Sequence, residues 1–415
     1  MPGPNGAPSG TAPRARPLRI GLFGAFHPMS DRAGGSSTGM AVLFEGSARV
    51  AHVTVFGTAG STAPEHLALP HLTVLPIWSP DRPRTLLKAL RAMTRRAGEL
   101  DGYVFNIYPT SFGRFPPANG LGMLLPVFVA KLTRRPVVVF MHNFVESQDL
   151  TRLGYEVSPL AVRAAMWLEA RVARSTIVVT GLPSVAEAAR TALRAPVRLV
   201  PFRFVDSVAG LLAEVPHPTS ASGPPSAEDP LKILLFGSWG PQKDLEGALA
   251  LLRPWIEGGA NATVTVAGAA NPNFPPYIAL LERLARELPK DGFRFIGRVE
   301  DTRLAEVFRG HDVLLLPYHA TGGYSGVMNL GAAFGIQVVA YDHAQLREFA
   351  GQLGIDAQFV PPNDGEAVRR ALLEAGRRRT RRSRDTEGRL AIARAGTEAI
   401  LDLLGAPPAP AGAVP

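Results

Sequence analysis

The feature that most constrains the fold is a repeated alternation of short apolar segments with helical segments. The first strong strand is predicted at residues 18–26 (LRIGLFGAF), an almost continuous apolar run. Such runs are typical of strands buried on both faces of a parallel sheet. The alternation continues to the segment VRLVPF near residue 200. It predicts a doubly wound, Rossmann-like α/β domain.

A second alternation follows a segment of different composition. Residues 214–230 (EVPHPTSASGPPSAEDP) are rich in Pro, Ser and Ala and have no periodicity, which indicates a linker. The strands LKILLFGS, ATVTVAG, FRFIG, DVLLLPY and QVVAYD then alternate with helical patterns. The sequence therefore predicts two α/β domains with a ligand cleft between them, beyond the carboxyl ends of the strands. The predicted parts are a disordered leader (1–17), an N-terminal domain (18–205), a linker (206–230), a C-terminal domain (231–384), a helix that packs back across the domains (385–404) and a disordered tail (405–415).

Composition limits the classes of function. The 415 residues include no cysteine, which excludes disulfides and thiolate metal sites. The nine histidines are scattered without ligand spacing, so no metal and no cofactor are expected. No apolar run reaches the ~18 residues of a membrane span, and the amino terminus lacks the apolar core of a signal peptide. We therefore expect a cytoplasmic protein.

The formal net charge of +9 raises nucleic acids, membranes and phosphorylated substrates as partners. Residues 377–384 (RRRTRRSR) include no aromatic side chain on which a base could stack, so a nucleic-acid partner is not expected. Residues 82–96 (RPRTLLKALRAMTRR) form a basic amphipathic helix pattern. Such a helix suits peripheral contact with an anionic membrane or ordinary cover of a sheet, and the sequence leaves both open.

Two loops in the C-terminal half have the residue types of an anion site. In LLFGSWGPQKD, Lys243 follows Gly237 by six residues at the end of a strand, where a lysine can neutralise a phosphate as a point charge. In TGGYSGVMNL, a glycine-rich loop leads into a helix whose first backbone N–H groups, near Ser325 and Gly326, are unpaired. Taken alone, each loop has an ordinary alternative, a solvated lysine or an N-cap serine.

Several blocks in order resemble a known family. LLFGSWGPQKD, VTVAG, FRFIGRVEDTRLAEVFRGHDVLLLPY and SGVMNLGAAFGIQVVAYDHAQLRE, between residues 231 and 348, resemble the donor-binding domain of GT-B glycosyltransferases, most closely the retaining family 4. The N-terminal half resembles the acceptor domain more loosely, through its first strand with the following glycine loop and through VVVFMHN. The helix after that loop is expected at residues 40–50.

The resemblance implies roles for three groups of residues. The donor diphosphate would be bound by Gly237, Ser238, Lys243, Ser325, Gly326 and Val327. The transferred sugar and the acceptor would contact Gly34, Gly35, His142 and Asn143. Weaker contacts to the donor ribose or sugar would come from Asn329 and Glu348.

Three positions depart from the family pattern. Ser238 stands where the family usually has an arginine, and Gly322 and Leu330 stand where it usually has two glutamates. The second glutamate normally binds the nucleotide ribose, which leucine does not do. Asn329 is polar but lies about 100° away around the helix.

The resemblance implies a glycosyltransferase that moves a hexosyl group from a nucleoside diphosphate sugar to a hydroxyl acceptor, in carbohydrate or natural-product biosynthesis. We expect retention at the anomeric carbon, with His142 and Lys243 in catalytic roles. The chain has no Asp-x-Asp motif, which favours a metal-independent reaction. Two alternatives stay open: an inverting enzyme that uses His27 as its base, and an auxiliary subunit that binds nucleotide without turnover.

Overall fold

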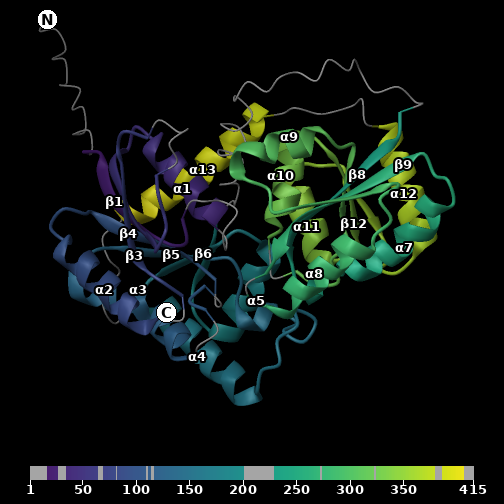
Figure 1. Cartoon of the computed structure of the whole chain (residues 1–415). Helices are drawn as coiled ribbons and strands as arrows, with labels where there is room; N and C mark the ends of the chain where they lie inside the picture. The colour runs from purple at the N-terminus through teal and green to yellow at the C-terminus, as the bar shows by residue number, and fades with distance from the viewer. Residues whose placement is uncertain are drawn as a thin grey trace, which may run out of the picture.

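The computed structural model describes residues 16–26, 34–63, 69–80, 82–108, 111–113, 116–200, 229–271, 273–321, 324–378 and 386–405. Two parallel sheets are present, each with helices on both faces (Figure 1). This confirms the prediction of two doubly wound α/β domains. His27, Gly322 and most of the predicted leader, linker and tail lie outside the described residues.

The first sheet has seven strands in the order β3-β2-β1-β4-β5-β6-β7. All neighbouring strands are parallel, and the order reverses between β1 and β4. In open α/β sheets ligands bind beyond the carboxyl ends of the strands at such a reversal. The strands are β1 (Leu18–Phe23), β2 (Val50–Thr58), β3 (Leu72–Trp78), β4 (Gly102–Ile107), β5 (Val137–Met141), β6 (Ile177–Thr180) and β7 (Val197–Leu199).

Helices bury both faces of this sheet. Phe23 packs into a core with Leu86 and Met93 on one face, whereas Leu22 packs with Phe44 and Leu401 on the other. This two-sided burial explains why the first strand is apolar without alternation. The helices of the first face are α2 (Pro83–Arg95), α3 (Pro116–Thr133), α4 (Pro159–Ser175) and α5 (Pro183–Leu193), and those of the second are α1 (Gly34–Glu45) and α13 (Thr386–Gly405).

The second sheet has the order β10-β9-β8-β11-β12-β13 and reverses between β8 and β11. Its strands are β8 (Leu231–Trp239), β9 (Ala262–Ala270), β10 (Phe293–Gly297), β11 (Val313–Leu316), β12 (Gln337–Tyr341) and β13 (Gln358–Val360). One face is covered by α7 (Leu245–Glu257), α8 (Pro276–Glu287) and α12 (Gly365–Arg377). The other is covered by α9 (Leu304–Arg309), α10 (Gly326–Phe334) and α11 (Ala344–Leu353). Short 3-10 turns lie at η1 (Val145–Ser147), η2 (Pro241–Lys243) and η3 (Asp301–Arg303).

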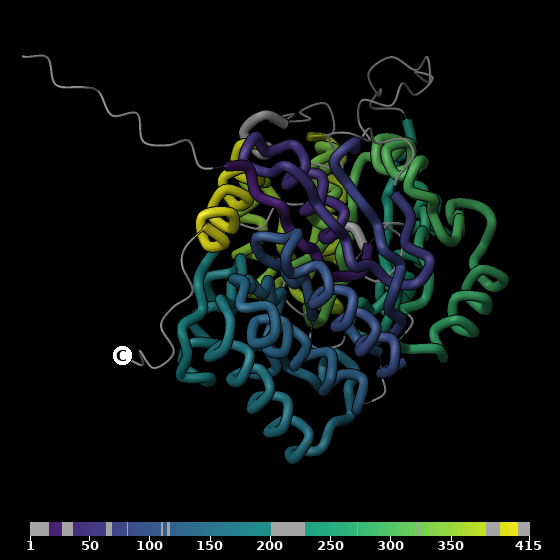
Figure 2. The backbone as a smooth tube through the Cα atoms, turned by 90° about the vertical axis from the view of Figure 1, so that its left-hand side faces the viewer, coloured from purple at the N-terminus to yellow at the C-terminus, as the bar shows by residue number. Residues whose placement is uncertain are grey.

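The last described helix returns to the N-terminal domain. In Figures 1 and 2, α13 (yellow) lies beside α1, although it follows the C-terminal domain in the chain. Ala393, Ile400 and Leu401 of α13 are fully buried in the core of the first sheet. The chain therefore crosses between the domains twice, through the linker and before α13.

Helix α1 begins earlier than the sequence predicts. It starts at Gly34 instead of Met40, and Val50 belongs to β2. Glycine and serine are poor helix formers on propensity alone, which is why residues 34–39 read as a loop. In the fold, Ser36 and Ser37 both bond to Asn106 of β4, and this tertiary contact holds the first turn in helical form.

Candidate functional site

Lys243 lies at the reversal of the second sheet. It ends η2, which follows β8, and its Nζ lies 5.0 Å from the centroid of the Tyr318 ring, just beyond β11. Desolvation lowers the pKa of Lys243 to about 8. Among the described residues it has no ion-pair partner, because the neighbouring Asp244 caps α7 through the Gly247 N–H and lies 2.8 Å from His319 Nε2. A partly buried cation thus lies over an aromatic ring with no counter-ion in the described part of the chain.

Two paired glycines make room for this ammonium. Gly237 of β8 is opposite Gly268 of β9. A Cβ on Gly237 would lie 2.8 Å from Lys243 Nζ. Gly268 has a φ of +109°, and a Cβ there would lie 1.8 Å from the Gly237 carbonyl oxygen. Glycine is therefore required at Gly268, and at Gly237 the absence of a Cβ leaves space for the end of the Lys243 side chain.

Helix α10 begins beside Tyr318. Ser325 is its N-cap, and the Ser325 Oγ accepts a hydrogen bond of 3.1 Å from the Met328 N–H. The amides of Gly326 and Val327 come earlier in the first turn, where backbone N–H groups have no partner within a helix. A Cβ at Gly326 would meet nothing within 4 Å, so this end of the helix is open. It combines unpaired donors with the positive end of the helix dipole.

Asn329 lies one turn further along α10 and is fully buried. Neither its amide oxygen nor its amide nitrogen has a hydrogen-bond partner among the described residues. Buried amides almost always have partners, so this one fits a place next to a polar ligand. Leu330, the position where the family usually has a glutamate, packs into the hydrophobic core at 8% exposure.

Tyr324 connects the second domain to the first. Its ring meets the ring of His142 edge-on, with centroids 5.8 Å apart, and packs on Phe349 of α11. Burial raises the pKa of Tyr324 well above its ordinary value, and Thr180 and Gly181 of the N-terminal domain partly oppose this shift. The α10 start and the carboxyl ends of β5 and β6 are therefore next to each other.

The N-terminal side of this region is a buried polar network without charge. His142, just after β5, is fully buried, and its Nε2 lies 2.6 Å from Asn106 Oδ1. The Asn106 Nδ2 donates to Ser36 Oγ and Ser37 Oγ, both at 2.8 Å. Because the Asn106 amide nitrogen is used in this way, its oxygen accepts, and His142 must carry its proton on Nε2.

His142 is held neutral. Burial lowers its pKa to about 3, and its ring stacks on Tyr108 at 4.0 Å between centroids. Because burial disfavours its charged form, the imidazole is an uncharged polar group at neutral pH. Asn143, the next residue, is also buried.

The turn after His142 is fixed by Glu169. This side chain of α4 is 1% exposed, and its Oε1 accepts a 2.9 Å hydrogen bond from the Val145 N–H. Burial raises the pKa of Glu169 to about 8, so the carboxyl group is largely protonated at neutral pH. It anchors η1 against α4 and thereby the segment that carries His142 and Asn143.

Glu348 makes a contact between the domains. It lies on α11 and accepts hydrogen bonds from the Ser184 N–H, at 2.9 Å, and from the Ser184 hydroxyl. Gln345 and Gln352 on the same helix donate to the carbonyls of Ser147 and Gly181. In this structure Glu348 is thus part of a polar face of α11 that docks on the N-terminal domain.

The predicted site residues gather in two groups. Those at the end of β8, in η2 and at the start of α10 form the side with Lys243, although Ser238 is exposed. Gly34 and Gly35 form the first turn of α1, next to Ser36 and Ser37, and His142 and Asn143 follow β5. His27 and Gly322 lie outside the described residues.

Sequence reasoning missed Asn106, Tyr318, Tyr324 and Glu169. Asn106 had a visible signal, because it is the one polar side chain in the strand segment YVFNI. Glu169 had a similar signal, since it lies on the buried side of a helix. The two tyrosines had none, because an aromatic residue after a strand is ordinary in a core.

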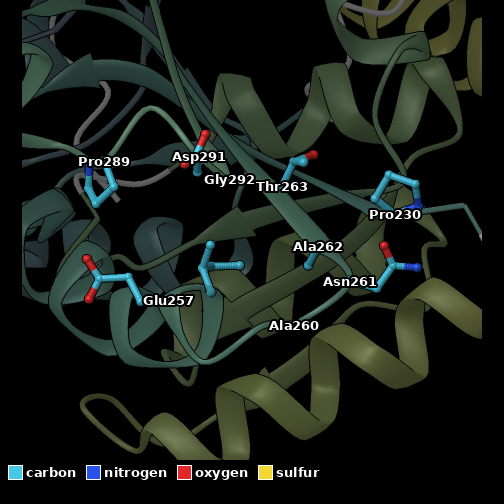
Figure 3. A pocket seen from close by; sticks show the side chains of 10 residues that line it. Pro230, Glu257, Ala260, Asn261, Ala262, Thr263, Pro289, Asp291 and Gly292 are labelled. Atoms are coloured by element: carbon cyan, nitrogen blue, oxygen red, sulfur yellow. The ribbon is translucent and has the colours of Figure 1, made fainter.

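A cavity of about 500 Å³ lies at the other edge of the second sheet. Figure 3 shows its lining, with Pro230 before β8, residues 261–263 at the start of β9 and Gly292 before β10. These are the amino ends of the strands, opposite the edge where α/β sheets bind ligands. We therefore do not include it in the candidate site.

Two negative findings hold for the residues that the structure describes. No group of three or more His, Asp or Glu side chains is placed to hold a metal ion there. None of the described helices combines the length and apolarity needed to cross a membrane.

Comparison with known proteins gives a match at the level of structure. No family model and no curated protein sequence matches this chain. Anabaena HepE in complex with UDP and glucose superposes with a TM-score of 0.63 at 14% identity, covering 94% of this chain and 100% of that one. Sucrose-phosphate synthase from Thermosynechococcus elongatus gives 0.58 at 17% identity over 93% and 95%. A UDP-forming α,α-trehalose-phosphate synthase from Burkholderia vietnamiensis gives 0.62 at 13% identity over 95% and 100%.

These matches span both sheets and the helices between them. At sequence identities below 20%, this structural similarity shows the fold alone. The chain has the GT-B fold, two parallel α/β domains whose strand ends face a shared interdomain site.

Proposed function

We propose that this protein is a glycosyltransferase that transfers a hexosyl group from a nucleoside diphosphate sugar to a hydroxyl acceptor. One observation carries the proposal: Lys243 is a desolvated cation at the topological switch point of the second sheet, and no described residue forms an ion pair with it. Desolvating an ammonium is unfavourable unless an anion compensates for it. A diphosphate bound at this point supplies that charge.

The start of α10 supports the same ligand. In the proposed complex, Lys243 neutralises the diphosphate, and the amides of Gly326 and Val327 donate to its distal phosphate. Gly237 lets the phosphates approach the strand end, and the unpartnered amide of Asn329 faces the donor. UDP-glucose is the first donor to test, because HepE is described in complex with it at a TM-score of 0.63.

The chemistry that suits these groups is leaving-group stabilisation. As the bond from the anomeric carbon to the phosphate oxygen breaks, negative charge grows on the diphosphate, and Lys243 with the α10 amides stabilises it. The bond from the acceptor oxygen to the anomeric carbon forms on the same face, and the acceptor proton passes to the departing phosphate. This route gives retention and uses no metal ion and no cofactor.

The neutral network around His142 suits the sugar side of the reaction. A fixed, uncharged imidazole orients a sugar hydroxyl without competing with Lys243 for the diphosphate. Gly34 and Gly35 at the start of α1 lie beside this network and would line the acceptor entrance.

The test is turnover by the purified full-length chain. We expect release of UDP from UDP-glucose, or from another member of a panel of UDP-, GDP-, ADP- and dTDP-sugars, with transfer to a hydroxyl acceptor detected by mass spectrometry. Proton NMR of the product should show the anomeric configuration of the donor. An inverted product would contradict the retaining mechanism and direct attention to His27 as a base.

The auxiliary-subunit alternative has one observation in its favour: Leu330 packs in the core where the family usually has a ribose-binding glutamate. Nucleotide binding by calorimetry without turnover of any donor in the panel would support it. Absence of both binding and turnover would contradict the donor site itself.

A further inference from the structure

Three adjacent helices of the N-terminal domain carry many cations and no exposed carboxylate. Helices α2, α3 and α4 pack side by side on one face of the first sheet (Figures 1 and 2). Their exposed side chains include eight cations, four of them on α2: Arg84, Lys88, Arg91 and Arg95. The single carboxylate on the three helices is Glu169, which is buried.

These cations are not neutralised by neighbours. None of the eight forms an ion pair with a described residue. Among the described residues, the nearest exposed acids along the chain are Glu99 and Glu156; both lie outside the three helices, and Glu99 is paired with Arg96. The outer surface of α2, α3 and α4, here named the α2–α4 face, is therefore strongly positive.

The α2–α4 face is also unusually apolar. Leu160 is 76% exposed and Trp167 is 62% exposed, both on α4. Leu160, Trp167 and Arg174 follow each other at seven-residue spacing, and Arg163 and Arg171 lie three or four residues from them, so the five side chains share one side of the helix. The opposite side carries Glu169, Val172 and Ala173, which are buried.

The other two helices repeat this combination. Leu87 on α2 is 44% exposed, and Leu132 and Phe128 on α3 are 63% and 38% exposed. Five of the ten large hydrophobic side chains exposed in the described part of the chain therefore lie on these three helices. Scattered exposed leucines need no explanation, but a cluster among cations marks an interaction surface.

We propose that the α2–α4 face docks on the surface of a lipid bilayer that contains anionic phospholipid. The arginines and lysines would contact the headgroup phosphates, and Trp167 would lie at the level of the headgroups. Leu160 and Leu132 would enter the boundary of the acyl chains. A nucleic acid would satisfy the cations but would leave the leucines in water, since base stacking uses aromatic faces. The proposal does not depend on the glycosyltransferase reaction, because docking involves none of the donor-site residues.

The test is vesicle binding by the full-length chain, without donor or acceptor. Flotation with vesicles of phosphatidylcholine alone is compared with vesicles containing about a third phosphatidylglycerol, at low and high salt. We expect binding to the anionic vesicles only, and loss of binding as salt screens the charges. The emission of Trp167 should shift to the blue on binding, because Trp78 and Trp239 are already buried and the partly buried Trp255 lies on α7 of the other domain, outside this face.

Two double variants separate the charged and the apolar contributions. Leu160→Gln with Trp167→Gln should weaken binding at least about tenfold and remove the emission shift. Arg163→Gln with Arg171→Gln should weaken binding about 10- to 30-fold at low salt, since each charge near the surface contributes about fivefold. The matched control is Ile278→Gln with Arg286→Gln on α8, which also removes an exposed hydrophobic and an exposed cation. Circular dichroism confirms that each variant is folded.

Three results would overturn the proposal. The first is no binding of the wild type to anionic vesicles at low salt. The second is a loss of binding in the α8 control that equals the loss in the α4 double variants. The third is wild-type binding to zwitterionic vesicles that persists unchanged in the α4 double variants. If vesicles fail to bind while a random DNA duplex binds through Arg163 and Arg171, the surface recognises nucleic acid instead.

Discussion

In both domains the strand order reverses beside the first strand of the sheet, between β1 and β4 in one and between β8 and β11 in the other. The C-terminal domain places the Lys243 cation at its reversal, with the amino end of α10 nearby. The N-terminal domain places Asn106 there, bonded to His142 and two serines without any charge. The same topology thus places a cation at one reversal, here called the positive side, and a neutral polar network at the other, here called the neutral side.

This difference matches two different tasks. The negative charge that develops on a diphosphate leaving group is best stabilised by a cation and by oriented backbone amides in a place with little water. A sugar hydroxyl is best oriented by neutral groups whose positions are fixed, because an additional positive charge would attract the diphosphate instead. Substitutions on the two sides should therefore have separable effects, on donor affinity for one and on fold stability for the other.

The largest effect is expected from Lys243→Met. Hydrogen bonds to charged groups contribute about 1.5–3 kcal/mol, so loss of the ammonium should weaken UDP binding by about 10- to 150-fold. Isothermal titration calorimetry measures this directly. Lys290→Met removes an exposed lysine elsewhere in the same domain and should leave the affinity unchanged. Equal UDP affinity of Lys243→Met and the wild type would contradict the proposal that Lys243 binds the diphosphate.

Asn106→Leu tests the neutral side. It leaves His142, Ser36 and Ser37 without their partner in a buried place, and we expect a loss of about 2–3 kcal/mol in the free energy of unfolding. Ser37→Ala, which removes one bond of the network, should cost about 1 kcal/mol. Urea unfolding gives both values. UDP affinity of the folded Asn106→Leu variant should stay near that of wild type, and a 100-fold loss would mean that the two sides are not separate.

Much of the fold and one side of the site could be predicted from the sequence. Continuous apolar strands gave the two sheets, and Lys243 and Ser325 could be found because each follows a strand with glycines around it. The network side was harder, since Asn106 and Ser36 are 70 positions apart and nothing local says that they meet. The start of α1 was misjudged for the same reason, because a tertiary bond overrides the low helix propensity of glycine and serine.

The pH dependence of donor binding should come from the positive side alone. The pKa of Lys243 is lowered to about 8, so its charged form falls above pH 8 in the free protein, while a bound diphosphate raises that pKa. Affinity should therefore be constant below about pH 7 and decrease by up to about tenfold per pH unit above 8. A nucleotide sugar is the suitable probe because it lacks the terminal phosphate group that titrates near pH 6.

Lys243→Met supplies the control for this titration and should show a flat profile above pH 8. His142, with a pKa lowered to about 3, stays neutral across the range and should add no transition between pH 5 and 8. A transition near pH 6 that Asn106→Leu abolishes would show instead that the neutral side takes up a proton.

The smallest effect is expected from Glu348→Gln. In the structure the Glu348 carboxylate accepts a hydrogen bond from Ser184 at the start of α5. The substitution keeps an acceptor but removes a negative charge from the amino end of the helix. The interaction of such a charge with the helix dipole contributes about 0.3–1 kcal/mol to stability. Donor affinity should change less than about threefold, and Ser184→Ala should give no additional effect in the double variant. The resemblance to family 4 suggests instead that Glu348 contacts the donor ribose. If Glu348 binds the ribose, Glu348→Gln should lower the affinity for UDP but not the affinity for a UDP analogue that lacks the ribose hydroxyls. If Glu348 only contacts Ser184, the substitution should cause the same small change in affinity for both ligands.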